Sequence, residues 1–210
     1  MNTKEQIINE ALRQFAEKGY AGTSMSDIAK PLDISKAALY KHFKGKQEIF
    51  DRIIEDSERR FDDLLENLSV HFQAKDAGTD PEDVRFYAGI NPVKLSSNVL
   101  SFVRFAMTDP YSIQVRHMLK ISQFQSRELG SLYTRRYVDT MLDYDTKLFG
   151  ELMKAGFMKK DDPKQMALYF CAPVFMYMEI WDREPEKEHE CMEAIRKHVS
   201  HFFEMTACER

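Results

Sequence analysis

Apolar residues recur at steps of three, four and seven along most of the chain, which is the period of helices that bury one face. The first segment with this pattern is residues 3–17, and residues 46–72 predict one long helix with the same pattern. Alternating apolar and polar runs separated by turn residues, the pattern of strands, do not recur, and Gly and Pro are few. The sequence therefore predicts an all-α chain.

Proline pairs divide the second half of the chain into further helices. Asp-Pro, Asn-Pro and Glu-Pro recur there, and proline fits the first turn of a helix because that turn needs no N–H donor. The polar stretch of residues 73–81, which holds Gly78 and Pro81, predicts a loop after the long helix. The helices predicted beyond it are residues 81–89, 92–108, 110–125, 128–155, 163–183 and 186–206.

Residues 24–46 predict two short helices, a tight turn and the start of a third helix. Ser24 with Asp27 is the pattern of a capping box, and Ser35 is the N-cap candidate of the second helix, residues 36–42. Asp33 lies at the turn, and Asp tolerates a left-handed backbone better than most residues. Two short helices at a steep angle, the second exposing small and basic residues, are the geometry that places a helix in the major groove of DNA.

The candidate DNA contacts follow from the chemistry of each side chain. Ala37 can contact a thymine methyl group, and Lys36 or Lys41 can reach a guanine edge or a phosphate. The hydroxyl and N–H groups of Thr23 and Ser24 suit a phosphate near the start of a helix, although the two residues can also act only as caps.

Charge is distributed unevenly, although the formal net charge is only −4. Residues 1–50 hold eight Lys/Arg and six Asp/Glu, a net charge of +2, and residues 51–210 hold 22 and 28, a net charge of −6. A group of lysines is more often just a solvated face. Here the lysines coincide with the predicted helix pair, which favours phosphate contacts.

A set of residues spread over the first 50 positions has the spacing of a known family. Its members are Ile7, Ala11, Phe15, Gly19, Tyr20, Thr23, Ser24, Ile28, Ala29, Ser35, Leu39, Tyr40, Phe43 and Lys46. The segment resembles the TetR family of transcriptional regulators over residues 3–50, about a quarter of the chain. The resemblance implies that Tyr40 and Lys46 contact the phosphate backbone of DNA. His42 could also contact the DNA backbone or have no part in DNA binding.

Three positions depart from the family pattern. Pro31 falls late in the first helix of the motif, where it removes a backbone donor and favours an early end of that helix. Asp33 replaces the usual turn glycine, and Ala37 replaces a glycine early in the second helix. All three bear on the angle at which the second helix is presented.

The resemblance also implies an organisation and a function. Residues 1–46 would bind DNA, and residues 47–210, reached through the long helix 46–72, would bind an effector and dimerise. The expected protein is a dimeric repressor that binds a palindromic operator in double-stranded DNA and is released by a small apolar or aromatic ligand. Two alternatives stay open: a helical small-molecule-binding or scaffold protein with a vestigial helix-turn-helix, and a DNA-binding dimer with a protein effector or none.

Residues 166–178 are apolar on every side. A membrane span needs about 18 or more such residues, so this run is too short and no membrane partner is expected. A helix of this kind must be covered all round, and a second copy of the chain is the predicted cover for the side that its own domain leaves open. The predicted interface residues of the homodimer are Met166, Phe170, Val174, Tyr177, Ile195, Val199 and Phe202.

Methionine and aromatic residues are concentrated in residues 100–181. Adaptable and broad side chains suit a bulky apolar ligand, although the same residues at helical spacing are more often plain core. The TetR resemblance implies an effector cavity in this region. The candidate lining residues are Phe102, Phe105, Met107, His117, Met118, Phe124, Met141, Tyr144, Phe170 and Trp181.

The sequence gives little support for catalysis, a cofactor or a metal site. No Gly-rich phosphate loop, GxSxG or HExxH motif is present, so no catalytic residue, enzyme activity or cofactor is predicted. His198 and His201 share a helix face, but a metal site needs more ligands than these two, and no metal is predicted. The three cysteines form no CxxC pair and the N-terminus has no signal-peptide core, so the expected location is a reduced cytoplasm.

Overall fold

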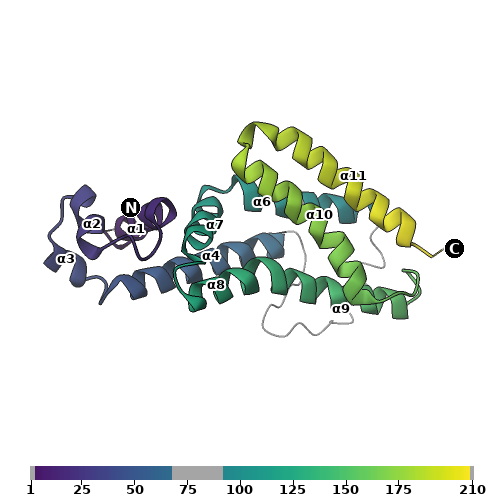
Figure 1. The fold of residues 1–210 in the computed structure, drawn as a ribbon, viewed down its shortest axis with the longest axis horizontal. Coiled ribbons are helices and arrows are strands. Elements are labelled where there is room, and N and C mark those ends of the chain that lie inside the picture. The colour runs from purple at the N-terminus through teal and green to yellow at the C-terminus, as the bar shows by residue number, and fades with distance from the viewer. Residues whose placement is uncertain (1–2, 68–91, 209–210) are drawn as a thin grey trace. The chain divides into compact units, whose positions relative to one another are not determined.

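The computed structural model describes residues 3–67 and 92–208, and the secondary-structure elements within them are all helices (Figure 1). This confirms the predicted all-α class. The elements in chain order are α1 (Thr3–Lys18), α2 (Met25–Ala29), the 3-10 turn η1 (Lys30–Leu32), α3 (Lys36–Tyr40), α4 (Lys46–Asn67), α6 (Pro92–Thr108), α7 (Pro110–Ser122), α8 (Arg127–Thr134), the π turn η2 (Arg135–Asp139), α9 (Thr140–Lys154), α10 (Pro163–Arg183), the 3-10 turn η3 (Pro185–Lys187) and α11 (Glu188–Thr206).

The helix starts predicted at Pro92, Pro110 and Pro163 are confirmed. Asp109 caps α7 by accepting a hydrogen bond from the Ser112 N–H at 2.8 Å, and Asp162 caps α10 by accepting one from the Lys164 N–H at 3.0 Å. Each cap satisfies an N–H that has no partner within its own helix. None of the described helices combines the length and the apolarity that crossing a bilayer requires.

Two predicted helices differ from the structure. α7 ends at Ser122 rather than near residue 125, and the helix predicted over residues 128–155 is interrupted by the π turn η2. A π turn inserts one extra residue into the helical repeat, which interrupts the regular period of three to four residues. The end of the long helix (residues 68–72), the loop 73–81 and the short helix 81–89 lie outside the described residues.

Backbone packing divides the chain into two compact units. Unit 1 comprises Met1–Asp63 and Thr108–Arg135, and unit 2 comprises Leu64–Met107 and Arg136–Arg210. Helices α7 and α8 therefore belong with the N-terminal helices. The functional division at residue 46 is a different boundary and stays a prediction.

Unit 1 is built around α1, which packs against α2 and η1 and against α7. Its apolar face is buried, as the helical period predicted. Phe15 of this face meets Tyr20 and Phe50, with ring centroids 5.1 to 6.4 Å apart within the trio. These contacts join α1, the loop that follows it and the start of α4 into one small core.

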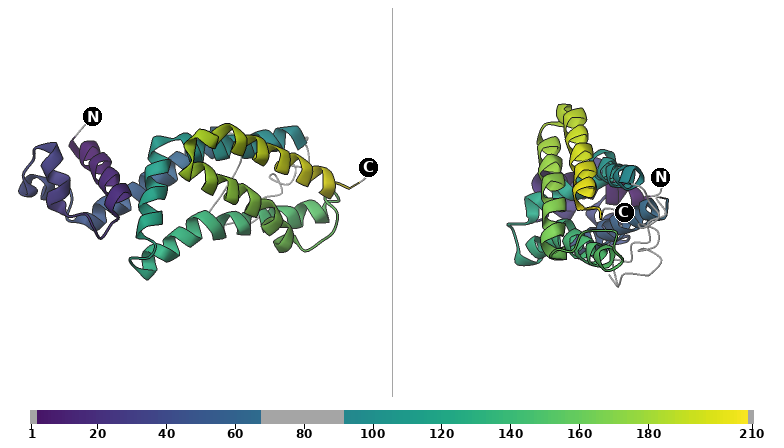
Figure 2. Two further views of the ribbon diagram at one scale, coloured as in Figure 1. Left: turned by 45° about the horizontal axis from the view of Figure 1, so that its top comes forward. Right: turned by 90° about the vertical axis from the view of Figure 1, so that its right-hand side faces the viewer.

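Unit 2 is built around α10, which packs against α9 and α11 (Figure 2). Four phenylalanines form the centre of its core, with all their ring centroids 5.0 to 6.4 Å apart. They are Phe149, Phe170, Phe202 and Phe203. Val103 and Met107 of α6 belong to the same buried cluster, so four helices contribute to this core.

Candidate nucleic-acid interface

The first helix of the motif, α2, begins at the predicted capping box. Ser24 Oγ accepts a hydrogen bond from the Asp27 N–H at 3.2 Å, and the Asp27 carboxylate accepts one from the Ser24 N–H at 2.8 Å. The Ser24 hydroxyl also donates to this carboxylate, and these hydrogen bonds from Ser24 lower the pKa of Asp27 below its usual value. The start of α2 is thus held by its own side chains.

The turn between α2 and α3 has the predicted left-handed residue. Asp33 has a φ of +52°, and its N–H donates to the Lys30 carbonyl at 3.2 Å. The Ile34 N–H donates to the Ala29 carbonyl at 3.3 Å, and Ser35 then caps α3 by accepting from the Ala38 N–H at 3.0 Å. This turn sets the direction of α3, which ends two residues before the predicted end at residue 42.

The outer side of α3 carries four of the predicted DNA contacts. Lys36, Ala37, Tyr40 and Lys41 are all exposed. Leu39 on the opposite side is fully buried and attaches α3 to the core of unit 1. The Lys36 ammonium lies 6.0 Å from the centre of the Tyr40 ring. The arrangement offers two cations, a phenol and a small apolar residue on one surface, which suits phosphates and base edges in a major groove.

Thr23 does not lie on this surface. It is 2% exposed, and its hydroxyl donates toward the carbonyls of Gln14 and Gly19, at 3.3 and 3.2 Å. The prediction that the Thr23 hydroxyl contacts a phosphate is therefore corrected, because this hydroxyl already donates to carbonyls within residues 3–46 of unit 1, which we call the head. Ser24 is exposed, and His42 is half-buried.

The side chain of Lys46, at the start of α4, contacts the loop between α1 and α2. Its ammonium donates to the carbonyls of Tyr20 and Thr23, at 2.6 and 2.8 Å, and lies 4.2 Å from the centre of the Tyr20 ring. Burial lowers the pKa of this ammonium. Two of its three N–H donors are used in these hydrogen bonds, and the Tyr20 ring adds a cation–π contact. The phosphate contact that the resemblance implies for Lys46 stays a prediction.

Several residues that shape the head were missed by sequence reasoning. Tyr20 N–H donates to Ser122 Oγ at 3.0 Å, and Ala21 N–H donates to Gln125 Oε1 at 3.1 Å, so the end of α7 holds the loop between α1 and α2. These partners are 102 and 104 residues apart in sequence, and no local pattern connects them. Gly19 has a φ of +76°, and a Cβ atom there would lie 2.5 Å from Gln125 Nε2.

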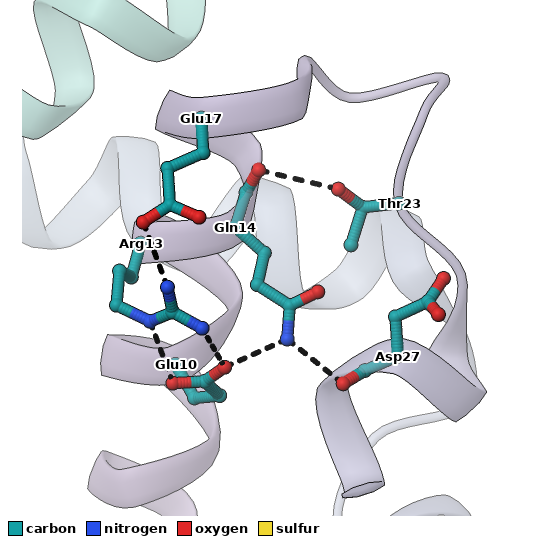
Figure 3. A network of polar contacts seen from close by, with 6 residues as sticks. All are labelled: Glu10, Arg13, Gln14, Glu17, Thr23 and Asp27. Carbon is teal, nitrogen blue, oxygen red and sulfur yellow. Dashed lines mark hydrogen bonds and ion pairs between the residues drawn. The ribbon is translucent and has the colours of Figure 1, made fainter. Parts of the chain in front are cut away.

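Gln14 is the other residue that sequence reasoning missed, and it joins α1 to α2 (Figure 3). Its side chain is almost completely buried, and its Nε2 donates to the Asp27 carbonyl at 2.8 Å and to Glu10 Oε1 at 2.7 Å. Arg13 pairs with the same Glu10 carboxylate, at 2.6 Å, and this contact is the main reason that the pKa of Glu10 is lowered. A polar residue on the otherwise apolar face of α1 was the available clue.

The ten candidate pocket residues are divided between the two units. His117, Met118 and Phe124 belong to unit 1, and the other seven belong to unit 2. Phe124 is 91% exposed, which corrects the prediction that it lines an enclosed cavity. Met107, Met118, Phe170 and Trp181 are buried, and the remaining candidates are half-buried. The effector cavity itself stays a prediction.

Most of the predicted interface residues are covered by their own chain. The five buried ones are Met166, Phe170, Ile195, Val199 and Phe202. A side chain that its own fold covers offers no surface to a partner, so the prediction is corrected for these five. Val174 and Tyr177 are half-buried. Periodicity identified the apolar positions of α10 and α11, but not which of them face inward.

A different set of apolar residues on α10 faces outward. Leu168, Tyr169, Phe175 and Met176 are 37 to 58% exposed, and their spacing places them on one stripe of the helix. A hollow of about 620 Å³ lies beside this stripe, between α10 and α11. Met176 and Tyr177 line it on one side, and residues 189–198 line it on the other.

A buried carboxyl group interrupts the apolar core of unit 2. Asp145 of α9 is 4% exposed, and the Cys171 thiol donates to its Oδ2 at 3.0 Å. Burial raises the pKa of Asp145 to about 7, against the smaller opposing effect of the thiol. Burial also raises the pKa of Cys171. Within the described parts of the chain, no group of three or more His, Cys, Asp or Glu residues is placed to bind a metal ion.

Residues 7–53 match the family model described as bacterial regulatory proteins, tetR family. The chain is 44% identical over 62 residues to IcaR of Staphylococcus epidermidis, the negative transcriptional regulator of the biofilm operon icaADBC. This match covers 30% of the chain and 34% of IcaR. With IcaR of Staphylococcus aureus strain Newman, the identity is 47% over 51 residues, 24% of the chain and 27% of the relative. The chain thus spans about a third of the length of the curated relatives it matches.

Solved structures extend the likeness to the whole fold. A Mesorhizobium loti protein assigned to the TetR family of transcriptional regulators has a TM-score of 0.67 and 19% identity, covering 98% of this chain and 96% of that one. SmeT in complex with triclosan has a TM-score of 0.64 and 20% identity, covering 99% and 92%. SmeT is the repressor of the multidrug efflux pump SmeDEF of Stenotrophomonas maltophilia. At this identity the likeness concerns the fold alone.

Proposed function

We propose that the protein is a transcriptional repressor that binds operator DNA through α3, as the match of residues 7–53 to the tetR family model supports. The observation that carries this proposal is the exposed side of α3, with Lys36, Ala37, Tyr40 and Lys41 directed away from a covered Leu39. The likeness to IcaR, a negative regulator, supports repression. A bacterial regulator with this role acts in the cytoplasm, where the chromosome lies.

The proposed DNA contacts are of two kinds: some position the protein on the DNA backbone, and others recognise the base sequence. Tyr40 and Lys46 hold the phosphate backbone, and Ser24 and His42 lie where they can add to it. Ala37 contacts a thymine methyl group, Lys36 reaches a guanine edge, and Lys41 adds a phosphate contact. Ala37 is therefore the residue whose replacement changes the preferred sequence.

The repressor acts as a homodimer on a palindromic operator. The outward apolar stripe of α10 supports this, because exposed apolar residues on one stripe favour contact with a second copy. A two-fold contact brings the same stripe of both chains together and presents two copies of α3 to successive major grooves.

A small apolar or aromatic molecule bound in unit 2 regulates the dimer. The core of this unit is rich in methionine and aromatic side chains, and Asp145 gives it one polar group. SmeT, which shares the fold, is known in complex with triclosan. The ligand lowers DNA affinity because it binds more tightly to a dimer in which the two α3 helices are wrongly spaced.

The test is selection of duplexes from a random-sequence library by the purified protein, followed by titration at several salt concentrations. We expect a palindromic sequence to be enriched. Replacing Lys41 by Ala is expected to weaken binding and to reduce the slope of log affinity against log salt by about 0.9 for one lost phosphate contact. Lys154→Ala, an exposed lysine of α9, is the control and should leave both unchanged. No enriched duplex, or identical salt slopes for Lys41→Ala and the parent, would overturn the proposal.

A further inference from the structure

Pro31 leaves a gap in the hydrogen bonding of α2. In a helix, the carbonyl of residue i accepts from the N–H of residue i+4, so the Asp27 carbonyl would take its hydrogen bond from residue 31. Proline has no N–H, and the chain here passes from α2 into the 3-10 turn η1. The Asp27 carbonyl therefore has no donor within its own helix, and a hydrogen bond to it must come from another element.

Gln14 of α1 supplies that donor. Its Nε2 lies 2.8 Å from the Asp27 carbonyl oxygen and 2.7 Å from Glu10 Oε1, as Figure 3 shows. Both partners are acceptors, so only the nitrogen end of the amide can face them, and its two N–H groups serve one each. Gln14 is 2% exposed, so the amide nitrogen that makes both hydrogen bonds is shielded from bulk water.

The rest of the network keeps Gln14 in this orientation. Arg13 donates to both oxygens of Glu10, at 2.6 and 3.0 Å, and to Glu17 at 2.7 Å, which keeps the Glu10 carboxylate charged and in place. Gln14 Oε1, in contrast, is buried and has no partner among the described residues. A buried amide oxygen without a partner is unfavourable, so this orientation persists only because the nitrogen contacts outweigh that cost.

We propose that Gln14 is a positioning residue for DNA recognition, which replaces the hydrogen bond that Pro31 removes from α2. By holding the Asp27 carbonyl it fixes the angle between α1 and α2. The turn at Asp33 carries this angle to α3, whose exposed side makes the DNA contacts. The inference rests on the proposed function in one respect, namely that the angle of α3 matters for binding DNA.

A double-mutant cycle tests the proposal. Pro31→Ala restores an N–H that can serve the Asp27 carbonyl, and Gln14→Met removes the donor while keeping the length of the side chain. With Pro31 present, Gln14→Met is expected to weaken binding to the duplex selected by the parent about tenfold, the loss of one or two buried hydrogen bonds. In the Pro31→Ala background, Gln14→Met should weaken binding to the same duplex by less than about twofold. Gln6→Met, an exposed glutamine of α1, is the matched control and should have no effect in either background.

The second measurement is amide hydrogen exchange of residues 25–29, which does not depend on DNA. When Pro31 is kept, Gln14→Met is expected to raise the exchange rate of these amides about tenfold. When Pro31 is replaced by alanine, the same substitution should change the rate little. If the parent selects no duplex, the proposed function fails, while the exchange cycle still tests the link between Gln14 and Pro31. Equal effects of Gln14→Met in the two backgrounds, in affinity or in exchange, would overturn the inference. A Gln14→Met variant that folds only together with Pro31→Ala would support it, and one that folds in neither background would overturn it.

Discussion

The two compact units are stabilised by different kinds of contact. In unit 1, helices as short as five residues are joined by hydrogen bonds between side chains and the backbone of another element, as at Gln14, Lys46 and Ser122. In unit 2, helices of 15 to 21 residues pack around four phenylalanines. A short helix buries too little apolar surface to fix its own angle, so directional hydrogen bonds do so. Long helices fix their angles by packing.

This difference bears on function. In the proposed function α3 must meet a DNA groove at a set angle, and hydrogen bonds of fixed length and direction meet that need. An aromatic and methionine core can rearrange around a ligand at smaller cost. Asp145 is the exception in unit 2, because it places a titratable group in the middle of that core. Four predictions, ordered by the size of the expected effect, test the contrast between the units.

Phe149→Ala is expected to have the largest effect on stability. The ring is completely buried between Phe170, Phe202 and Phe203, and its removal should lower the free energy of unfolding by about 3 to 5 kcal/mol. Chemical denaturation followed by circular dichroism measures this loss. Phe124→Ala removes a ring that is 91% exposed and should change stability by less than about 0.5 kcal/mol. Similar losses for the two variants would contradict the assigned core.

Asp145→Asn is expected to remove a pH dependence from the stability of unit 2. The pKa of Asp145 is raised from 3.8 to about 7, so the folded state binds this proton more tightly than the unfolded state does. Stability from this group is present below pH 4 and is lost as the pH rises to 7, by an amount on the order of 3 kcal/mol. The Asn variant should therefore equal the parent near pH 4 and exceed it at pH 8.

Thermal unfolding at a series of pH values checks this expectation. Asp143→Asn, an exposed aspartate of the same helix, is the control and should retain the parent's pH dependence. A steeper loss of stability with pH in Asp145→Asn than in the parent would contradict the assigned burial.

Lys46→Met is expected to have an intermediate effect, confined to unit 1. The change keeps the apolar stem of the side chain but leaves the carbonyls of Tyr20 and Thr23 without their donor, which should cost about 1 to 3 kcal/mol. Hydrogen exchange of residues 19–29 should quicken, while exchange in α10 should not. Lys44→Met, an exposed lysine nearby, serves as the comparison and should be almost neutral. A loss spread over both units would show that the head is not held locally.

Arg13→Met and Arg196→Met are expected to have the smallest effects. Each arginine is exposed and pairs with glutamates of its own helix, Arg13 in unit 1 and Arg196 in unit 2. Exposed pairs of this kind contribute about 0.2 to 1 kcal/mol, and the contribution falls with added salt. Denaturation at low and high salt measures both. A clearly larger loss for Arg13→Met would show that Glu10 transmits it to Gln14.

The helical class, the caps and the left-handed turn could be predicted from the sequence. Ser24 with Asp27, Ser35 and Asp33 act within a few residues of themselves, and their chemistry decides their local backbone. The exposed side of α3 followed from the same local pattern. The recognised family pattern, confirmed over residues 7–53, also depends only on spacing within a short segment.

The choice of which apolar face meets which neighbour could not be predicted in the same way. Ile195, Val199 and Phe202 form a perfect helical stripe, but periodicity is the same for a stripe that meets its own chain and one that meets a partner. For the same reason Phe124 was expected inside a cavity and lies outside.

What the sequence by itself determined is therefore the local structure: the helices, their caps and the surface that α3 presents. The tertiary structure alone decided which donors serve which distant acceptors. Ser122 reaches the loop after α1 from 102 residues away, and Gln14 reaches the carbonyl that Pro31 leaves open. The physical reason is that a buried carbonyl or N–H must find a partner, but any donor or acceptor brought close by the fold can satisfy it.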